Sequence, residues 1–372
     1  MNRYWHNIEY SISLFIFISV NILFILKYVG RFNIVYSIII SLLYSLAIFL
    51  FLKNIEKINI QRKLIITFVS LSIISLIVLQ YSIDPYELQI DRWSAIHNFI
   101  YNLFHGIYPY SAQTHLGGYG SPFPVWQFLH IPFYLLGNVG LSFLLALCLF
   151  IHSIYKLFNY KAALFVFLLL LLSPGFLYEV TVRSDLITNF LFVCAIICYI
   201  RHINVRFEKH WLSIAILCGL MMSTRLSALI PFIIFFFSDY FSSRWKVKIT
   251  FPVVILLSFI VTFLPFIFWD GNMLLYFEYS PFVLQSRQGN IYDFILFIPI
   301  CIWLSLSWNN DFSKYMSTTA IFLFLFVAIT FIHNMYDNSN WNELFNSAYD
   351  ITYFNMSLPF VIAALITRKD FS

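Results

Sequence analysis

The chain has 372 residues, of which 61% are hydrophobic, and its mean hydropathy is +0.82. Only 10% are charged, and the formal net charge is +5. A soluble core cannot absorb this much apolar surface, whereas a lipid bilayer can. The composition therefore excludes an ordinary soluble enzyme and gives no reason to expect a nucleic-acid partner. We predict an all-α fold, a polytopic transmembrane helix bundle forming a single integral membrane domain over residues 1–372.

Apolar runs recur along the whole chain and predict about twelve spans. In chain order they are Tyr10–Leu26, Ile34–Leu52, Leu64–Tyr81, Ile131–Ile151, Ala162–Leu172, Leu186–Ile200, Trp211–Met222, Leu226–Phe237, Phe251–Trp269, Ile291–Leu306, Met316–Ile332 and Ile351–Leu365. The seventh and eighth are short, and they are either two short helices or one re-entrant pair. The first run lacks a small-residue cleavage site nearby, so we interpret it as an anchor and not a removed signal peptide.

Basic residues favour one orientation, because cytoplasmic loops carry an excess of Lys and Arg. With both termini cytoplasmic, 16 of the 22 basic residues lie inside and six lie outside. The outer six are Lys27, Arg31, Arg92, Arg183, Arg225 and Arg287. The five cysteines all fall in apolar runs and are expected to be small buried hydrophobes without a disulfide. We expect the protein in the plasma membrane, which is the inner membrane of a bacterium. Its longest polar loops, and therefore its working face, lie outside in this orientation.

The segment Ser82–His130 is too polar to span a bilayer and is the first large outer loop, before middle spans over residues 131–238 and C-terminal spans over 239–372. Asp84 and Pro85 predict a helix start, and Gly106 predicts its end. Apolar residues recur at helical spacing between them: Trp93, Ile96, Ile100, Leu103, Phe104 and Ile107. The pattern predicts an amphipathic juxtamembrane helix with its stripe in lipid or on the bundle. Two prolines then make Ser121–Trp126 a rigid, extended lip.

Few ionisable residues lie at the outer ends of spans, where such residues tend to pair or to mark a functional site. Asp91 lies beside the apolar stripe, Asp185 precedes the sixth span, and Arg225 lies between two short spans. A carboxylate can take a proton from a hydroxyl, and arginines can hold a phosphate. Structural alternatives stay open, because Asp185 could cap the following helix and Arg225 could pair with a lipid phosphate.

Three motifs follow one another in the outer loop: Asp91–Ile96 (DRWSAI), Tyr108–Tyr110 (YPY) and Pro122–Trp126 (PFPVW). With Gly106, they resemble the first outer loop of the GT-C fold glycosyltransferases. These polytopic enzymes use polyprenyl-phosphate sugars and include mannosyltransferases and aminoarabinose transferases. Further along, Arg183–Leu186 (RSDL) is similar to that family's second acidic position. The segment from Gly219 through Arg225 to Pro231 is similar to one in which a basic residue contacts the donor phosphate.

The resemblance implies a membrane glycosyltransferase of cell-envelope glycans, moving a sugar from a polyprenyl-phosphate donor to a glycan, lipid or protein acceptor at the outer face. Asp91 and Asp185 are then the catalytic residues. The implied substrate-binding residues are Arg92, Arg183, Arg225, Tyr108 and Tyr110.

The chain departs from the family pattern in three respects. Two extra spans precede the outer loop, so that three stand where the family has one, no large C-terminal soluble domain is apparent, and Arg92 stands where many members have a second acid. That last departure leaves the metal requirement open. The outer histidines show no ligand spacing, so we expect no metal, with a bound divalent metal as the alternative.

Two other functions remain open, a transporter or flippase of a lipid-linked sugar and a non-catalytic subunit of a glycan assembly system. Transporters place polar residues near the middle of the membrane and often have paired broken helices. Here the polar residues gather at the outer ends of the spans, which favours an enzyme.

Overall fold

The computed structural model describes residues 2–55, 62–276, 278–286, 291–308, 311–337 and 349–367. Within these ranges every regular element is a helix, and the nearest approach to a strand is an isolated bridge between Gln113 and Tyr119. The prediction of an all-α fold is therefore confirmed. Lys57, Arg287, Arg368 and Lys369, which the charge argument counted, lie outside the described residues.

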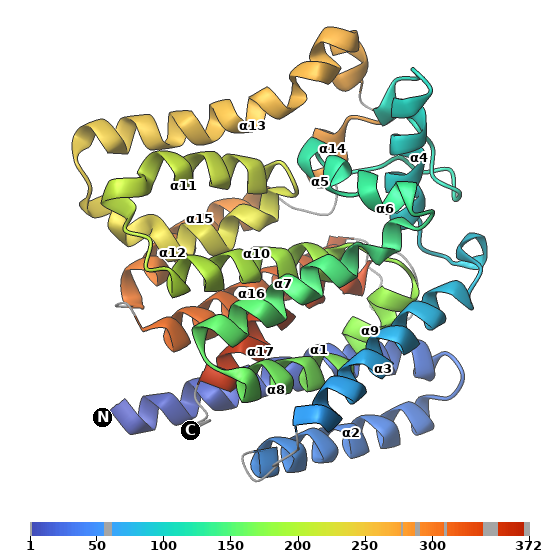
Figure 1. Ribbon diagram of the computed structural model, residues 1–372, viewed down its shortest axis with the longest axis vertical. Coiled ribbons are helices and arrows are strands. Elements are labelled where there is room, and N and C mark those ends of the chain that lie inside the picture. The colour runs from blue at the N-terminus through green and yellow to red at the C-terminus, as the bar shows by residue number, and fades with distance from the viewer. Residues whose placement is uncertain are drawn as a thin grey trace.

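The longer helices run back and forth through the molecule, side by side (Figure 1). They are α1 (Asn2–Gly30), α2 (Ile34–Asn54), α3 (Arg62–Tyr81), α7 (Ser142–Leu157), α8 (Tyr160–Leu171), α10 (Leu186–His202), α11 (Phe207–Met222), α12 (Leu229–Ser242), α13 (Trp245–Leu274), α15 (Ile291–Ser307), α16 (Phe312–Asp337) and α17 (Leu358–Thr367). Among the described residues, six helices are long and apolar enough to cross a membrane, or up to seven if a bent pair counts as one span.

Shorter elements connect the long helices. They are η2 (Pro85–Glu87), α4 (Arg92–Phe104), η3 (Pro109–Ser111), α5 (Pro124–Leu129), α6 (Ile131–Leu135), η4 (Val139–Leu141), α9 (Pro174–Thr181), η5 (Leu226–Ala228), α14 (Pro281–Ser286) and η6 (Ile351–Ser357). Several begin with proline, whose fixed φ and missing N–H suit a first helical position. In Figure 1, α4, α5, α6 and α14 gather at one end of the bundle and both termini lie at the other. We call these the loop end and the terminal end.

Two predicted spans differ from the structure. Ile131–Ile151 is not one helix, because α6 ends at Leu135, Gly137 adopts a φ of +84°, and α7 begins only at Ser142. The run Ala162–Leu172 is followed by an unpredicted helix, α9, which is bent 71° from α8. Pro174 causes this break, since proline disfavours helical geometry in the residue before it.

The outer helix also starts later than predicted. Asp84 does accept a hydrogen bond from the Tyr86 amide at 2.9 Å, but it caps only the single turn η2, and α4 begins at Arg92. Gly106 ends α4 as expected: its φ is +69°, and the Ile107 amide bonds back to Asn102 at 3.0 Å. The predicted extended lip holds only to Phe123, because α5 starts at Pro124.

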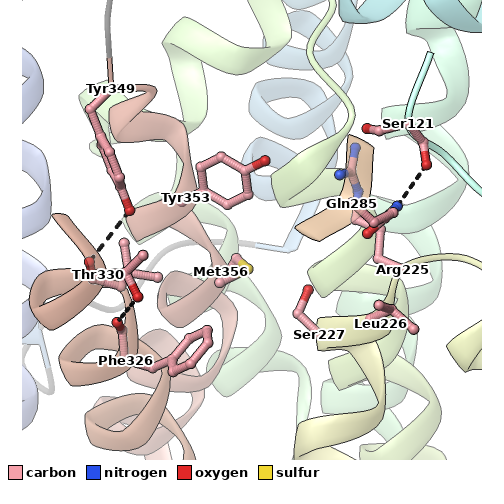
Figure 2. Close-up of a pocket in the computed structure, with 11 residues that line it drawn as sticks. Ser121, Arg225, Leu226, Ser227, Gln285, Phe326, Thr330, Tyr349, Tyr353 and Met356 are labelled. Carbon is pink, nitrogen blue, oxygen red and sulfur yellow. Dashed lines mark hydrogen bonds between the residues drawn. The ribbon is translucent and has the colours of Figure 1, made fainter. Parts of the chain in front are cut away.

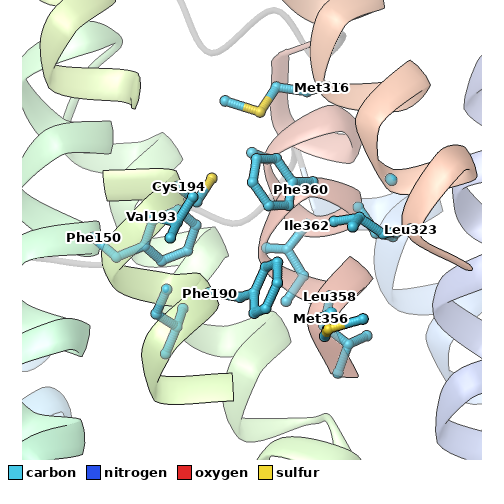
Figure 3. Packing of buried hydrophobic residues seen from close by; sticks show 14 of the residues in the cluster. Phe150, Phe190, Val193, Cys194, Met316, Leu323, Met356, Leu358, Phe360 and Ile362 are labelled. Atoms are coloured by element: carbon cyan, nitrogen blue, oxygen red, sulfur yellow. The ribbon is translucent and has the colours of Figure 1, made fainter. Parts of the chain in front are cut away.

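Two hydrophobic clusters hold the fold together. In the larger one, Phe190, Val193 and Cys194 of α10 face Phe360 of α17, with Met316 of α16 nearby (Figure 3). In the smaller one, the stripe of α4 packs against the phenylalanines of α13. The stripe therefore lies on the bundle over most of its length, although Phe104 and Ile107 remain exposed.

The outermost helices expose apolar side chains, as lipid contact requires. On α2, only two serines, Ile48 and Leu52 are buried, while leucines, isoleucines and phenylalanines cover its outer surface. The five cysteines are free; Cys148 of α7 is exposed, which corrects the expectation that all five are buried.

Candidate functional site

The site is built around Asp185, which precedes α10 at the loop end and is 2% exposed. It occupies the capping position, but its side chain makes no capping hydrogen bond. Instead, Arg225 Nη2 donates to both carboxylate oxygens, at 2.9 and 2.7 Å, and Trp126 Nε1 donates to Oδ2 at 2.6 Å. The simple helix-cap interpretation of Asp185 is therefore wrong.

A second ion pair continues the first. Arg92 Nη1 lies 3.9 Å from Asp185 Oδ1, and Arg92 Nη2 donates to Asp350 Oδ2 at 2.6 Å. The Arg92 guanidinium also lies over the Tyr353 ring, 5.2 Å from its centroid. We call the alternating row of Arg225, Asp185, Arg92 and Asp350 the charge row. It joins α4, α10, the start of η5 and the start of η6, segments far apart in the sequence.

The charge row fixes the protonation of its carboxylates. Burial alone would raise the pKa of Asp185, but Arg225 and then Arg92 outweigh burial and hold it at about 2. Burial likewise opposes ionisation of Asp350, yet Arg92 and Thr352 lower its pKa. At neutral pH both groups are anions. Asp185 is thus a poor proton acceptor and is suited to orienting Arg225 and Arg92.

Arg225 also lines a cavity of about 80 Å³, which has room for several water molecules. Figure 2 shows Tyr349, Tyr353 and Thr330 on one side of this cavity and Arg225, Ser227, Gln285 and Ser121 on the other. Gln285 Nε2 donates to the Ser121 carbonyl at 2.8 Å, which ties α14 to the outer loop. The cavity therefore opens between the C-terminal helices and the α11–α12 connection.

Two arginine nitrogens beside the charge row have unfilled hydrogen-bonding capacity. Arg92 Nη1 and Arg225 Nε are buried and have no hydrogen-bond partner among the described residues. Buried donors without partners are rare and costly, especially when charged. An anion that enters the cavity from the Arg225 side would find a guanidinium already held in place.

Asp91 precedes Arg92 of the charge row in the sequence, but its side chain contacts Thr114. Its Oδ2 accepts from Thr114 Oγ1 at 2.8 Å, and its side chain makes no capping bond to α4. Gly118 passes so close that a Cβ there would lie 3.1 Å from Asp91 Oδ2. Asp91 is half-buried and is not among the residues that line the Arg225 cavity.

Arg183 is a further predicted site residue that the structure places away from the cavity. Its backbone has a φ of +56°, and its Nη2 donates to the carbonyl oxygens of Gln80 at 2.7 Å and Ile83 at 3.4 Å. It therefore fastens the end of α3. The prediction that Asp91, Asp185, Arg183 and Arg225 line one cavity is met only by Arg225, with Asp185 directly behind it.

The two predicted substrate-binding tyrosines belong to the smaller hydrophobic cluster. Tyr110 is 2% exposed and packs edge-on against Phe99 and Phe266, with ring centroids 4.8 and 5.2 Å away. Tyr108 is buried beside Trp269. Both tyrosines hold α4 on α13 in this structure.

Sequence reasoning missed two acids near the site, the half-buried Asp350 and the buried Glu179. Asp350 is 258 positions from Arg92. Glu179, which is fully buried in α9, accepts from the Ile187 amide at 2.9 Å and from Asn355 Nδ2 at 2.6 Å. The sequence did offer a signal for Glu179, because it is an acid shortly after the apolar run Ala162–Leu172. For metals, the described residues contain no group of three or more His, Cys, Asp or Glu side chains suited to hold an ion.

Comparisons with protein-family models, with curated proteins and with solved structures found no match. The site's geometry must therefore carry any functional argument.

Proposed function

We propose that this protein is a membrane glycosyltransferase of the GT-C type, which moves a sugar from a polyprenyl-phosphate donor to an acceptor at the outer membrane face. The observation that carries the proposal is Arg225. Its guanidinium is buried and donates to Asp185, whose carboxylate also accepts from Trp126, and it borders a cavity at the loop end. A pre-aligned guanidinium suits a phosphate, because little side-chain freedom remains to be lost on binding.

The two halves of the reaction need different residues. Arg225 holds the donor phosphate, and Arg92, placed by Asp350 and Tyr353, adds a second positive charge nearby. Asp91 is the base, because it is half-buried, bonded to Thr114 alone through Oδ2, and not neutralised by an arginine among the described residues. Asp185 keeps the arginines in position and does not itself take the acceptor proton.

The test is transfer by the purified protein from a panel of polyprenyl-phosphate sugars. Asp91→Asn should lower the rate at least about a hundredfold, since general-base assistance contributes about 10² to 10⁴. Asp84→Asn is the matched control: it makes the same chemical change in the same loop, and asparagine caps η2 as well as aspartate. Full activity in Asp91→Asn would rule out Asp91 as the base.

Arg225→Lys should act on binding. Lysine keeps the charge but loses the planar fork, so the donor KM should rise several-fold more than kcat falls.

Cysteine labelling tests the orientation. Gln113→Cys should react from outside, and Lys246→Cys should react only after permeabilisation. The reverse pattern would place the site on the cytoplasmic face.

A second function, transport of a lipid-linked sugar, is favoured by one observation, the 71° bend between α8 and α9. Broken helices line many transporter sites. Glu179 in α9 is bonded within the bundle, however, and does not line the cavity beside Arg225. Movement of a polyprenyl-phosphate sugar across liposomes without transfer to an acceptor would support this second function.

A further inference from the structure

A second pocket is lined by residues of the α10–α11 connection and of the end of α12. Figure 1 shows these segments at the end of the bundle opposite α4 and α5. The pocket has a volume of about 480 Å³ and lies between the α10–α11 connection and the last turns of α12. Four charged side chains line it, two of each sign: Arg201, Arg206, Glu208 and Asp239.

The wall of this pocket is fixed by the backbone. Asn204 adopts a φ of +51°, the Val205 amide bonds to the Ile200 carbonyl at 3.3 Å, and the Asn204 amide bonds to Arg201 at 3.2 Å. These two hydrogen bonds, with a left-handed residue between them, form the usual glycine or asparagine ending of a helix. It turns the chain sharply, so that Arg206 and Glu208 follow Arg201 around the same opening.

Three of the four charged side chains around the pocket have no ion-pair partner among themselves. Among the described residues, Arg206, Glu208 and Asp239 form no salt bridge with each other, and all three are exposed. A ligand with one negative and one positive group could therefore meet both kinds of partner. A purely anionic ligand would meet the two carboxylates as well as the arginines.

An apolar groove adjoins the pocket. It has a volume of about 390 Å³ and runs along α12 between α11 and α13. Phe236 lines both the pocket and the groove, and Phe207 of the pocket packs on Phe251 of the groove with ring centroids 5.1 Å apart. The groove reaches from Tyr240 back to Leu229, most of the length of α12. A charged opening beside a long apolar groove matches the two parts of a membrane lipid.

We propose that the pocket and groove bind a glycerophospholipid with an ethanolamine headgroup. The lipid phosphate accepts from Arg206, the primary ammonium donates to Asp239 and Glu208, and an acyl chain lies in the groove. The composition of the lining selects this zwitterion over phosphatidylglycerol, which has no cation to pair with the acids. This site is independent of the proposed transferase activity.

The first experiment measures lipid retained by the full-length protein after exchange in detergent micelles holding equal amounts of dioleoyl phosphatidylethanolamine and dioleoyl phosphatidylglycerol. Wild type should prefer the ethanolamine lipid about fivefold, the size expected for exposed ion pairs. The double variant Glu208→Gln with Asp239→Asn should retain both lipids about equally. No preference in wild type, or an unchanged preference in the double variant, would overturn the proposal.

The phosphate and acyl parts need separate tests. Arg206→Gln should lower retention of both lipids several-fold, whereas Lys246→Gln, an equal loss of charge at an exposed position outside the pocket, should not. Ile233→Trp should also lower retention by filling the groove. Soluble O-phosphoethanolamine should fail to displace the lipid at equal concentration. Displacement, or full retention by Ile233→Trp, would show that a free phosphate compound and not a lipid is the ligand.

Discussion

At the loop end of the bundle, charged side chains are buried and paired, whereas at the terminal end they stay exposed around an open pocket. Asp185 and Arg225 are 2% and 4% exposed and lie in direct contact. Arg206, Glu208 and Asp239 are exposed and make no salt bridge with one another among the described residues. The difference matters because a buried charge without a partner destabilises the fold, whereas an exposed charge is solvated by water and stays available to a ligand.

The largest expected effect is on the free energy of unfolding, when one charged side chain is removed at each end. Asp185→Ala leaves Arg225 and part of Arg92 buried without their carboxylate, so the free energy of unfolding should fall by about 3–5 kcal/mol. Arg206→Ala removes an exposed side chain and should change it by less than about 0.5 kcal/mol. Denaturant unfolding in detergent, followed by tryptophan fluorescence, measures both. Equal losses in the two variants would show that the charge row is not the more tightly coupled region.

The second largest effect is the loss of folding stability at the loop end as the pH falls. The pKa of Asp185 is about 2 in the folded protein, against the ordinary aspartate value of 3.8 in the unfolded chain. Because the folded value is the lower one, the ionised group stabilises the fold above pH 4, and that stabilisation disappears as the pH falls through 2. The loss should be roughly 2 kcal/mol. Thermal unfolding between pH 5 and pH 2 tests this: the Asp185→Asn variant should show a flatter pH dependence than wild type, and parallel curves would contradict it.

Sequence reasoning named three of the four members of the charge row and missed Asp350. Asp185 and Arg225 could be found because each is an isolated charge at the end of an apolar run, where charges tend to pair. The bond from Arg92 to Asp350 could not, since it depends on how η6 packs beside α10, and no local pattern encodes that contact.

Local signals failed where two local structures compete for the same residues. Asp84 and Pro85 make a good helix start, but a single 3₁₀ turn satisfies both, and α4 then begins seven residues after Pro85. Arg183 shares a motif with Asp185, yet its left-handed backbone sends the side chain toward α3. A motif fixes the order of residues and leaves the direction of each side chain to the backbone.

The smallest effect compares the two arginines that lie over aromatic rings. Arg92 lies 5.2 Å from the Tyr353 ring centroid at the loop end, and Arg201 lies 5.8 Å from that of Phe312 at the terminal end. Such contacts are worth about 0.5–1 kcal/mol when exposed and about 2 when desolvated. Double-mutant cycles with Arg→Gln and aromatic→Leu isolate each coupling from the packing lost by truncation.

We expect about 1–2 kcal/mol for Arg92 with Tyr353 and roughly 0.5 kcal/mol for Arg201 with Phe312, because Arg92 is only 14% exposed and lies nearer to its ring. Tyr353→Phe is the control at the loop end, since it keeps the ring and should preserve the coupling. It should also leave donor KM near the wild-type value, while Tyr353→Leu raises it a few-fold by loosening Arg92. A stronger coupling at the terminal end would reverse the comparison and place the better-ordered cation beside the lipid pocket.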